Sequence, residues 1–98
     1  MITVEKRGIL LQKTKSYFEN EGVLNPAVIK NETGIHLFYR AVSEGNFSSI
    51  GYCRLQDPLK IEVRSEAPVL DPQFDYESHG VEDPRIVKID DLYYMTYT

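Results

Sequence analysis

The stretch Asn25-Pro26-Ala27-Val28-Ile29-Lys30 returns fifty-eight residues later as Asp83-Pro84-Arg85-Ile86-Val87-Lys88. In the same register and without a gap, three further pairs match: Glu32 with Asp90, Leu37 with Met95 and Tyr39 with Tyr97. An internal repeat of roughly 40–60 residues made of short strands is the sequence signature of a β-propeller blade. Chance similarity between two hairpins is the alternative, but the register runs over fifteen positions and includes both prolines. The repeat therefore predicts two successive blades.

Short runs rich in β-branched and aromatic residues, separated by turn residues, predict an all-β fold. We expect strands at residues 27–30, 35–41, 49–55, 60–64, 81–89 and 92–97. The turn at residues 31–34 closes the first hairpin, with Gly34 supplying a positive φ, and Asp90-Asp91 closes the last. A helical turn or two can be placed only at residues 12–19.

These strands form one blade and the first hairpin of another. Residues 1–98 are expected to belong to a single domain, with the first blade at about 22–80 and the start of the second at about 81–98. A propeller closes with roughly four to eight blades, and a half-built blade leaves unpaired backbone groups at its edge. We therefore expect the N-terminal part of a longer chain. A natural truncation, or completion by self-association, is the alternative.

Composition and charge narrow the function classes. A hydrophobic fraction of 42% with seven tyrosines indicates a folded chain. The net charge of -4, without a cluster of Lys and Arg, argues against nucleic acid as a partner. There is no signal-peptide core and no membrane-spanning run, and the lone Cys53 allows no internal disulfide, so we expect a cytoplasmic chain without a membrane partner. Cys53 is expected to be a buried strand residue and not a nucleophile.

Both copies of the repeat place a polar residue directly before proline, Asn25 in the first blade and Asp83 in the second. Ligands of propellers sit on the axis, where the innermost strands end, so both side chains are expected to face one central pocket. The following proline favours an extended backbone at each position. Asp83 is the candidate general acid. A carboxyl group fulfils that role where burial or a neighbouring anion keeps it protonated, and Glu82 supplies such an anion.

Three charged residues near this aspartate have open roles. Glu82 need not share its site, because neighbours on a strand point to opposite faces, and Arg85 would orient either carboxylate through a bidentate pair. Arg40 reaches the pocket only if its strand runs back towards the axis, and otherwise it is a solvated strand end.

His79 has no partner at metal-ligand spacing, and Ser48-Ser49 lacks the context of a hydrolase nucleophile. We therefore expect neither a metal site nor a nucleophilic serine.

At these residues the chain resembles glycoside hydrolase family 130, the β-mannoside phosphorylases and related mannosidases. The resemblance rests on the motif Gly80-Val81-Glu82-Asp83-Pro84-Arg85-Ile86 and on the segment Tyr93-Tyr94-Met95-Thr96-Tyr97-Thr98. Earlier segments match in order and spacing: Asn25-Pro26-Ala27-Val28, Phe38-Tyr39-Arg40 and Ser49-Ile50-Gly51. The resemblance implies a five-bladed β-propeller. The expected fold class is therefore all-β, a partial five-bladed propeller with the first blade and the start of the second.

The resemblance also implies the chemistry of a phosphorylase of the β-1,4-mannosyl type, acting with inversion. The residue matching Asp83 would be the general acid, passing its proton to the glycosidic oxygen through a hydroxyl of the mannose. Inorganic phosphate, a co-substrate and the only small molecule required besides the sugar, would attack the anomeric carbon from the opposite face and yield α-mannose 1-phosphate. No cofactor is implied. Residues matching Asn25, Arg40 and Glu82 would hold the sugar, with Arg85 nearby.

Two alternatives stay open, a β-mannoside hydrolase of the same family and a non-catalytic propeller that binds carbohydrate. The basic residues that would bind phosphate belong to later blades, so the sequence does not decide between phosphorolysis and hydrolysis. The expected partners are a β-mannoside oligosaccharide and phosphate. Residues 1–98 alone are expected to be inactive, because a pocket with one wall neither excludes water nor orients two substrates. The acceptor sugar, its linkage and a homo-oligomeric state of the full-length protein are left open.

Overall fold

Strands make up nearly all the regular structure, and the all-β prediction is confirmed. The computed structural model describes residues 1–98 throughout. In chain order the elements are β1 (Gly22–Asn31), β2 (Gly34–Ser43), β3 (Phe47–Asp57), β4 (Lys60–Arg64), the 3-10 turn η1 (Asp75–Glu77), β5 (Arg85–Ile89) and β6 (Leu92–Thr96). Residues 12–19 contain bends and a turn in place of the expected helical turns. No helix has the length and apolar character needed to cross a membrane.

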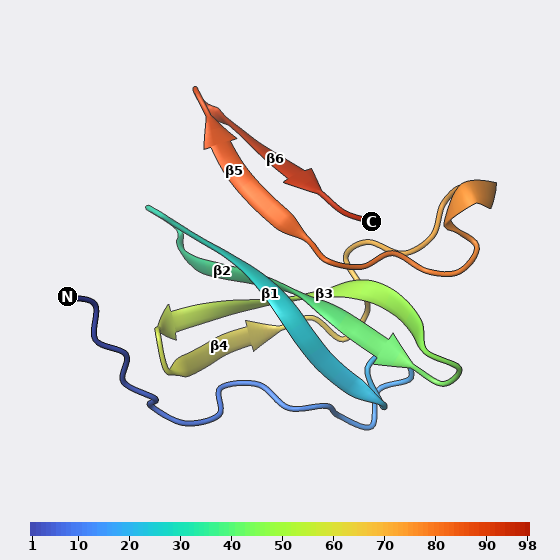
Figure 1. Ribbon diagram of the computed structural model, residues 1–98, viewed down its shortest axis with the longest axis horizontal. Coiled ribbons are helices and arrows are strands. Elements are labelled where there is room, and N and C mark those ends of the chain that lie inside the picture. The colour runs from blue at the N-terminus through green and yellow to red at the C-terminus, as the bar shows by residue number, and fades with distance from the viewer.

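The six strands form two antiparallel sheets that meet along β1 and β5 (Figure 1). The larger sheet is a meander in the order β1-β2-β3-β4, and the smaller sheet is the hairpin β5-β6. Contact between strands of the two sheets is confined to β1 and β5. The first strand of each sheet is thus the one that faces the neighbouring sheet.

Turn chemistry closes the first hairpin as the sequence predicts. The side chain of Asn31 accepts a hydrogen bond from the main-chain N–H of Thr33 at 2.9 Å, and Gly34 has a positive φ of 129°. The first strand begins earlier than expected, at Gly22 instead of residue 27. Its pairing with β2 shifts between Leu24 and Ala27, which forms a bulge that accommodates the proline between them.

The strand expected at residues 81–89 begins only at Arg85, so its first four positions were wrongly assigned. Pro84 has no N–H to donate to the ladder, and Asp83 has a φ of 55°. Upstream of this interruption, Glu82 still exchanges two main-chain hydrogen bonds with Thr98, at 3.0 and 2.8 Å. The pairing therefore resumes on both sides of the proline, as it does around the bulge in β1.

The hydrophobic core lies between one face of the larger sheet and the N-terminal segment. Its buried side chains are Phe18, Leu37, Tyr39, Ala41, Cys53 and Leu55, and Leu10 and Leu11 pack against them. Full burial of one large apolar side chain stabilises the fold by about 1.5–3 kcal/mol. Cys53 is a buried strand residue, as predicted, and burial raises the pKa of its thiol.

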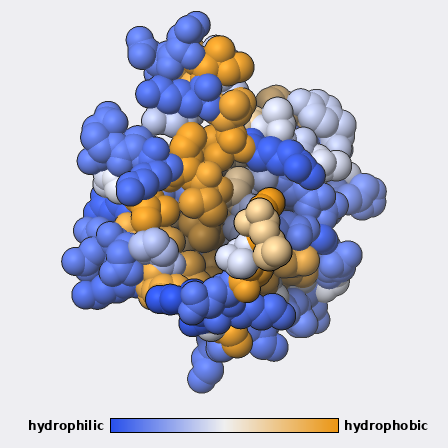
Figure 2. Space-filling model, turned by 60° about the vertical axis from the view of Figure 1, so that its left-hand side comes forward, coloured by the Kyte–Doolittle hydropathy of each residue, from blue (hydrophilic) through white to orange (hydrophobic).

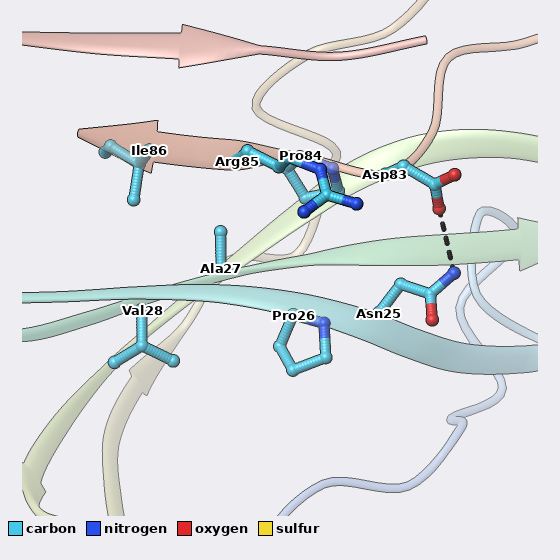
Figure 3. A pocket seen from close by; sticks show the side chains of 8 residues that line it. All are labelled: Asn25, Pro26, Ala27, Val28, Asp83, Pro84, Arg85 and Ile86. Carbon is cyan, nitrogen blue, oxygen red and sulfur yellow. Dashed lines mark hydrogen bonds between the residues drawn. The ribbon is translucent and has the colours of Figure 1, made fainter.

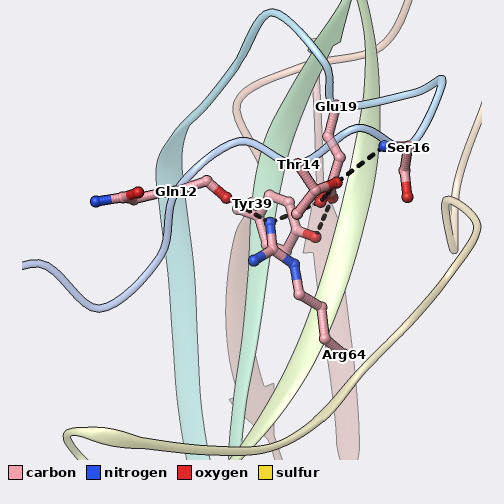
Figure 4. A network of polar contacts seen from close by, with 6 residues as sticks. All are labelled: Gln12, Thr14, Ser16, Glu19, Tyr39 and Arg64. Atoms are coloured by element: carbon pink, nitrogen blue, oxygen red, sulfur yellow. Dashed lines mark hydrogen bonds and ion pairs between the residues drawn. The ribbon is translucent and has the colours of Figure 1, made fainter.

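A buried carboxylate ties the N-terminal segment to this sheet (Figure 4). Glu19 is only 2% exposed. It accepts hydrogen bonds at 2.6 Å from the hydroxyls of Thr14 and Tyr39, and it forms an ion pair with Arg64 at 2.7 Å. A buried charge is tolerated when it is paired and hydrogen-bonded in this way. Burial, with the Glu19 carboxylate, raises the pKa of the Tyr39 phenol.

The same contact recurs fifty-eight residues later in the chain. Tyr97 donates a hydrogen bond to the buried Glu77, as Tyr39 does to Glu19. Each glutamate N–H also donates to the carbonyl oxygen three residues before it, at 3.1 Å for Glu19 and 2.9 Å for Glu77. The sequence repeat is therefore a repeat of structure, and it begins upstream of the residues that reveal it in the sequence.

Apolar side chains also gather on the surface (Figure 2). Figure 2 shows an apolar band bordered by hydrophilic side chains. Large exposed apolar residues of β1 and β5, the strands at the junction of the two sheets, include Val28, Val87 and Ile89. Contiguous exposed apolar surface of this kind is typical of a face that packs against further structure.

Candidate functional site

A cavity of about 450 Å³ lies where the two copies of the repeat meet (Figure 3). Each copy contributes four lining residues, which are Asn25, Pro26, Ala27 and Val28 from the first and Asp83, Pro84, Arg85 and Ile86 from the second. These residues are related in pairs by the fifty-eight-residue offset. The stretch that defines the repeat thus also builds the cavity.

The structure brings Asn25 and Asp83 together at one end of this cavity (Figure 3). Nδ2 of Asn25 donates a hydrogen bond to Oδ1 of Asp83 at 2.8 Å. The second carboxylate oxygen of Asp83 has no hydrogen-bond partner in the chain. The amide therefore orients the carboxylate and leaves one oxygen free for a ligand.

Both residues have a backbone conformation that the sequence did not predict. The expectation of an extended backbone before proline is wrong, because φ is 50° at Asn25 and 55° at Asp83. Positive φ is uncommon outside glycine, and Asn and Asp tolerate it better than other residues. Asn25 lies at the irregularity in the β1 ladder, Asp83 lies just before the start of β5, and a hydrogen bond joins their side chains. Backbone strain of this kind is often found at functional sites.

Arg40 and Glu82 form a second pair, linked to the first because Glu82 precedes Asp83 in the chain, and neither residue lines the cavity. Nη1 of Arg40 lies 2.7 Å from Oε2 of Glu82, and the two side chains are 17% and 36% exposed. Arg40 pairs with Leu24 across the first hairpin, so β2 does run back towards the junction of the repeats. Glu82 is therefore ion-paired with Arg40, whereas the sequence predicted a free anion beside Asp83.

Arg40 has further partners that the sequence did not suggest. Its Nε donates to Oγ of Ser48 at 2.7 Å, and a weaker contact of 3.5 Å joins Nη2 to Asn46. Ser48 is 3% exposed. The only available signal was strand register. Arg40 lies opposite Ile50, so Ser48, two residues before Ile50 in β3, lies on the same face of the sheet. A register cannot be read from the sequence until the hairpin turn is fixed.

The remaining charged candidates are less engaged. Arg85 lines the cavity, is exposed and makes no ion pair, so the expected bidentate pair with a carboxylate is not formed. His79 is exposed and makes no hydrogen bond. No group of three or more His, Cys, Asp or Glu side chains is placed to hold a metal ion. The site offers a carboxylate with one free oxygen and an unpaired guanidinium around an open cavity, an arrangement suited to binding a hydroxyl-rich ligand.

Known proteins resemble the chain over nearly its whole length. A family model described as beta-1,4-mannooligosaccharide phosphorylase matches residues 4–98. A protein of Thermoanaerobacter sp. (strain X514) named Beta-1,2-mannobiose phosphorylase is 44% identical over 95 residues, covering 83% of this chain and 31% of that protein. A second from that strain, named 1,2-beta-oligomannan phosphorylase, is 37% identical over 97 residues, covering 92% and 32%. The chain thus spans about a third of the length of these relatives.

A solved structure shares the fold. It is a crystal structure from Parabacteroides distasonis ATCC 8503, provisionally described as a glycoside hydrolase. The TM-score is 0.74 at 22% sequence identity, over 90% of this chain and 32% of that one. At this identity the likeness concerns the fold alone.

Proposed function

This chain belongs to glycoside hydrolase family 130, and from that premise we propose that it supplies one wall of the donor-sugar site of a β-mannoside phosphorylase. The proposal concerns a chain of its relatives' length that contains these residues, called the full-length enzyme below, since residues 1–98 cover only 31% and 32% of those relatives. The observation that carries it is the Asn25–Asp83 pair, which presents a free carboxylate oxygen to the cavity.

The proposed architecture is a five-bladed β-propeller within one domain, with the first blade at about residues 22–80 and the second beginning at about 81–98. Three features support it. The larger sheet is a four-stranded antiparallel meander, as propeller blades are. The β5-β6 hairpin repeats the pairing of β1 and β2 at the fifty-eight-residue offset, and β1 and β5 lie against each other. In a propeller, these would be the innermost strands of successive blades.

Asp83 is the proposed general acid. Its proton would pass, through a hydroxyl of the bound mannose, to the glycosidic oxygen as the bond from that oxygen to the anomeric carbon breaks. An oxygen of inorganic phosphate would form the new bond from the opposite face, giving α-mannose 1-phosphate and a shortened sugar. Phosphate is already an anion and needs no general base, so one catalytic carboxylate suffices. An inverting hydrolase needs a second carboxylate to activate water.

Four other residues are proposed to hold the sugar. Asn25 orients Asp83 and lines the cavity, and Arg85 offers an unpaired guanidinium there. Arg40 and Glu82 present a donor and an acceptor side by side, an arrangement that suits two neighbouring hydroxyls of one sugar ring. No cofactor is part of the proposal.

The linkage is proposed to be β-1,2. The description of the family model carries a β-1,4 linkage, in line with the β-1,4-mannosyl type expected from the sequence, whereas both relatives are named for β-1,2 linkages. Identities of 44% and 37% to two proteins named as β-1,2 phosphorylases favour the β-1,2 linkage. The full-length enzyme should therefore consume β-1,2-mannobiose faster than β-1,4-mannobiose at equal concentrations.

Phosphorus NMR of the full-length enzyme with mannobiose and inorganic phosphate tests the activity. We expect α-mannose 1-phosphate to appear, and residues 1–98 alone to produce none. Release of mannose at the same rate without phosphate would instead establish the hydrolase. Sugar binding in calorimetry without turnover under either condition would establish the non-catalytic alternative.

A further inference from the structure

Ser48 contacts both parts of the candidate site from β3. Its hydroxyl oxygen accepts the hydrogen bond of Arg40 Nε at 2.7 Å. Its main-chain carbonyl accepts a hydrogen bond from the N–H of Val81 at 2.9 Å, directly before Glu82 and Asp83. One buried residue of the first repeat thus fixes the arginine by its side chain and the acidic segment by its main chain.

Gly80 makes the main-chain contact unusually close. It forms an isolated parallel bridge with Ser48 and has a φ of 113°. A Cβ atom added there would lie 2.8 Å from both the main-chain nitrogen and the oxygen of Ser48, a distance that real Cβ atoms do not adopt. The acidic segment therefore begins with its backbone laid directly on Ser48, and glycine is the residue that permits it.

The hydroxyl of Ser48 determines how the Arg40 guanidinium is turned. With Nε bound to Ser48, Nη1 faces Glu82 and the planar group is held at two of its edges. Without the hydroxyl, Nε loses its acceptor and the group can rotate about its side-chain bonds. A buried donor left without an acceptor is also unfavourable. The geometry of the Arg40–Glu82 pair thus depends on an atom that need not contact any ligand.

We propose that Ser48 is a positioning residue for sugar binding, acting through Arg40 to hold the Arg40–Glu82 pair in register with Asp83. The inference rests on the proposed function, because the effect of the Arg40–Glu82 pair is measured as mannoside binding. It goes beyond it by assigning a role to a residue that is not itself proposed to contact the sugar. Only the side-chain oxygen is at issue, since the main-chain contacts of Ser48 remain when the hydroxyl is removed.

The test is Ser48→Ala in the full-length enzyme, with Ser49→Ala as the matched control. Ser49 is the next residue of β3, is 4% exposed, and makes no hydrogen bond to Arg40, so its replacement removes the same atoms from a comparable site. We expect KM for β-1,2-mannobiose to rise at least about tenfold in Ser48→Ala, the lower end of the range for one lost hydrogen bond to a charged group, with kcat nearly unchanged. The control should retain both constants. Equal effects of the two variants, or a fall in kcat alone, would overturn the proposal.

A double-mutant cycle separates positioning from a general structural effect. Arg40→Lys removes Nε, so Ser48→Ala should add little in that background if it acts through Arg40. A full additional tenfold rise in KM there would refute the pathway through Arg40.

A sugar-independent readout keeps this inference distinct from the proposed function. The Arg40 Nε–H resonance should exchange slowly with solvent in the wild-type protein and in Ser49→Ala, and at least about tenfold faster in Ser48→Ala, where its one direct acceptor is missing. If the wild-type enzyme shows no phosphorolysis, the proposed function fails. The exchange measurement would still decide whether Ser48 holds Arg40. Equal exchange in all three proteins would overturn the positioning role.

Discussion

The side-chain amide of Asn25 donates a hydrogen bond to the Asp83 carboxylate over 2.8 Å, although fifty-eight positions separate the two residues in the chain. Each occupies the same place in its copy of the repeat, before a proline and with a positive φ. One copy thus carries an amide and the other an acid, and the amide orients the acid. Two aspartates at these positions would instead place two negative charges at hydrogen-bond distance from each other.

Asp83→Asn in the full-length enzyme should abolish most of the phosphorolysis. Asn has nearly the same shape and tolerates the same backbone conformation, but its side chain has no carboxyl proton to give. General acid catalysis contributes roughly 10²- to 10⁴-fold to a rate, so kcat should fall by about that factor with KM little changed. Steady-state assays with calorimetric sugar binding check this. Activity within about tenfold of wild type would remove Asp83 from the mechanism.

Asn25→Asp should weaken the site electrostatically without changing its shape. Two carboxylates would then face each other where an amide now donates to an acid. We expect kcat/KM to fall about tenfold, and part of the loss to be recovered at high salt, which screens exposed charges. Asn20→Asp, at an exposed position outside the cavity, carries the same charge change and serves as the control. A loss that does not respond to salt would point to a steric cause instead.

Acid should destabilise the fold through Glu77. The hydrogen bond from Tyr97, then the one from the main-chain N–H of Gln73, holds the pKa of the Glu77 carboxyl below its usual range. A carboxyl group whose pKa is lowered by folding stabilises the folded state at pH values above its ordinary pKa of about 4.3. That contribution disappears as the pH falls through the lowered value.

Tyr97→Phe should reduce this part of the pH dependence, because it removes the first of these hydrogen bonds. Urea unfolding from pH 7 down to pH 3 measures it. Tyr76→Phe is the matched control, since Tyr76 is exposed and its hydroxyl makes no bond to Glu77. Parallel pH profiles for wild type and Tyr97→Phe would contradict the assignment.

Gly51→Ala should destabilise the core. A Cβ at this position would lie 2.3 Å from the Tyr39 ring, which is packed against the glycine from the neighbouring strand. Overpacking of this kind costs about 1–3 kcal/mol, which should appear as a lower midpoint in urea unfolding. Gly22→Ala is the control, because its Cβ would meet nothing within 4 Å. Equal midpoints for the two variants would show that the Tyr39 ring moves aside freely.

The sequence was most informative where chemistry is local. The turn at Asn31 to Gly34 depends on residues within the turn itself, and the repeat needs only comparison of the chain with itself. The backbone at Asp83 was not predictable, because the local preference before proline is extended and a partner fifty-eight residues away sustains the alternative. The contact of Arg40 with Ser48 likewise depends on strand register, which no single residue encodes.

The positive φ at Asn25 and Asp83 restricts how these two positions can be interrogated. Alanine at either one would lose the side-chain chemistry and also meet a conformational penalty of about 1–2 kcal/mol. An alanine scan would therefore overstate their chemical importance, and glycine would err in the other direction by loosening the backbone. Exchange between Asn and Asp is the substitution that leaves the main chain undisturbed. Only these two residues therefore allow the side-chain chemistry at either position to be tested separately from the backbone.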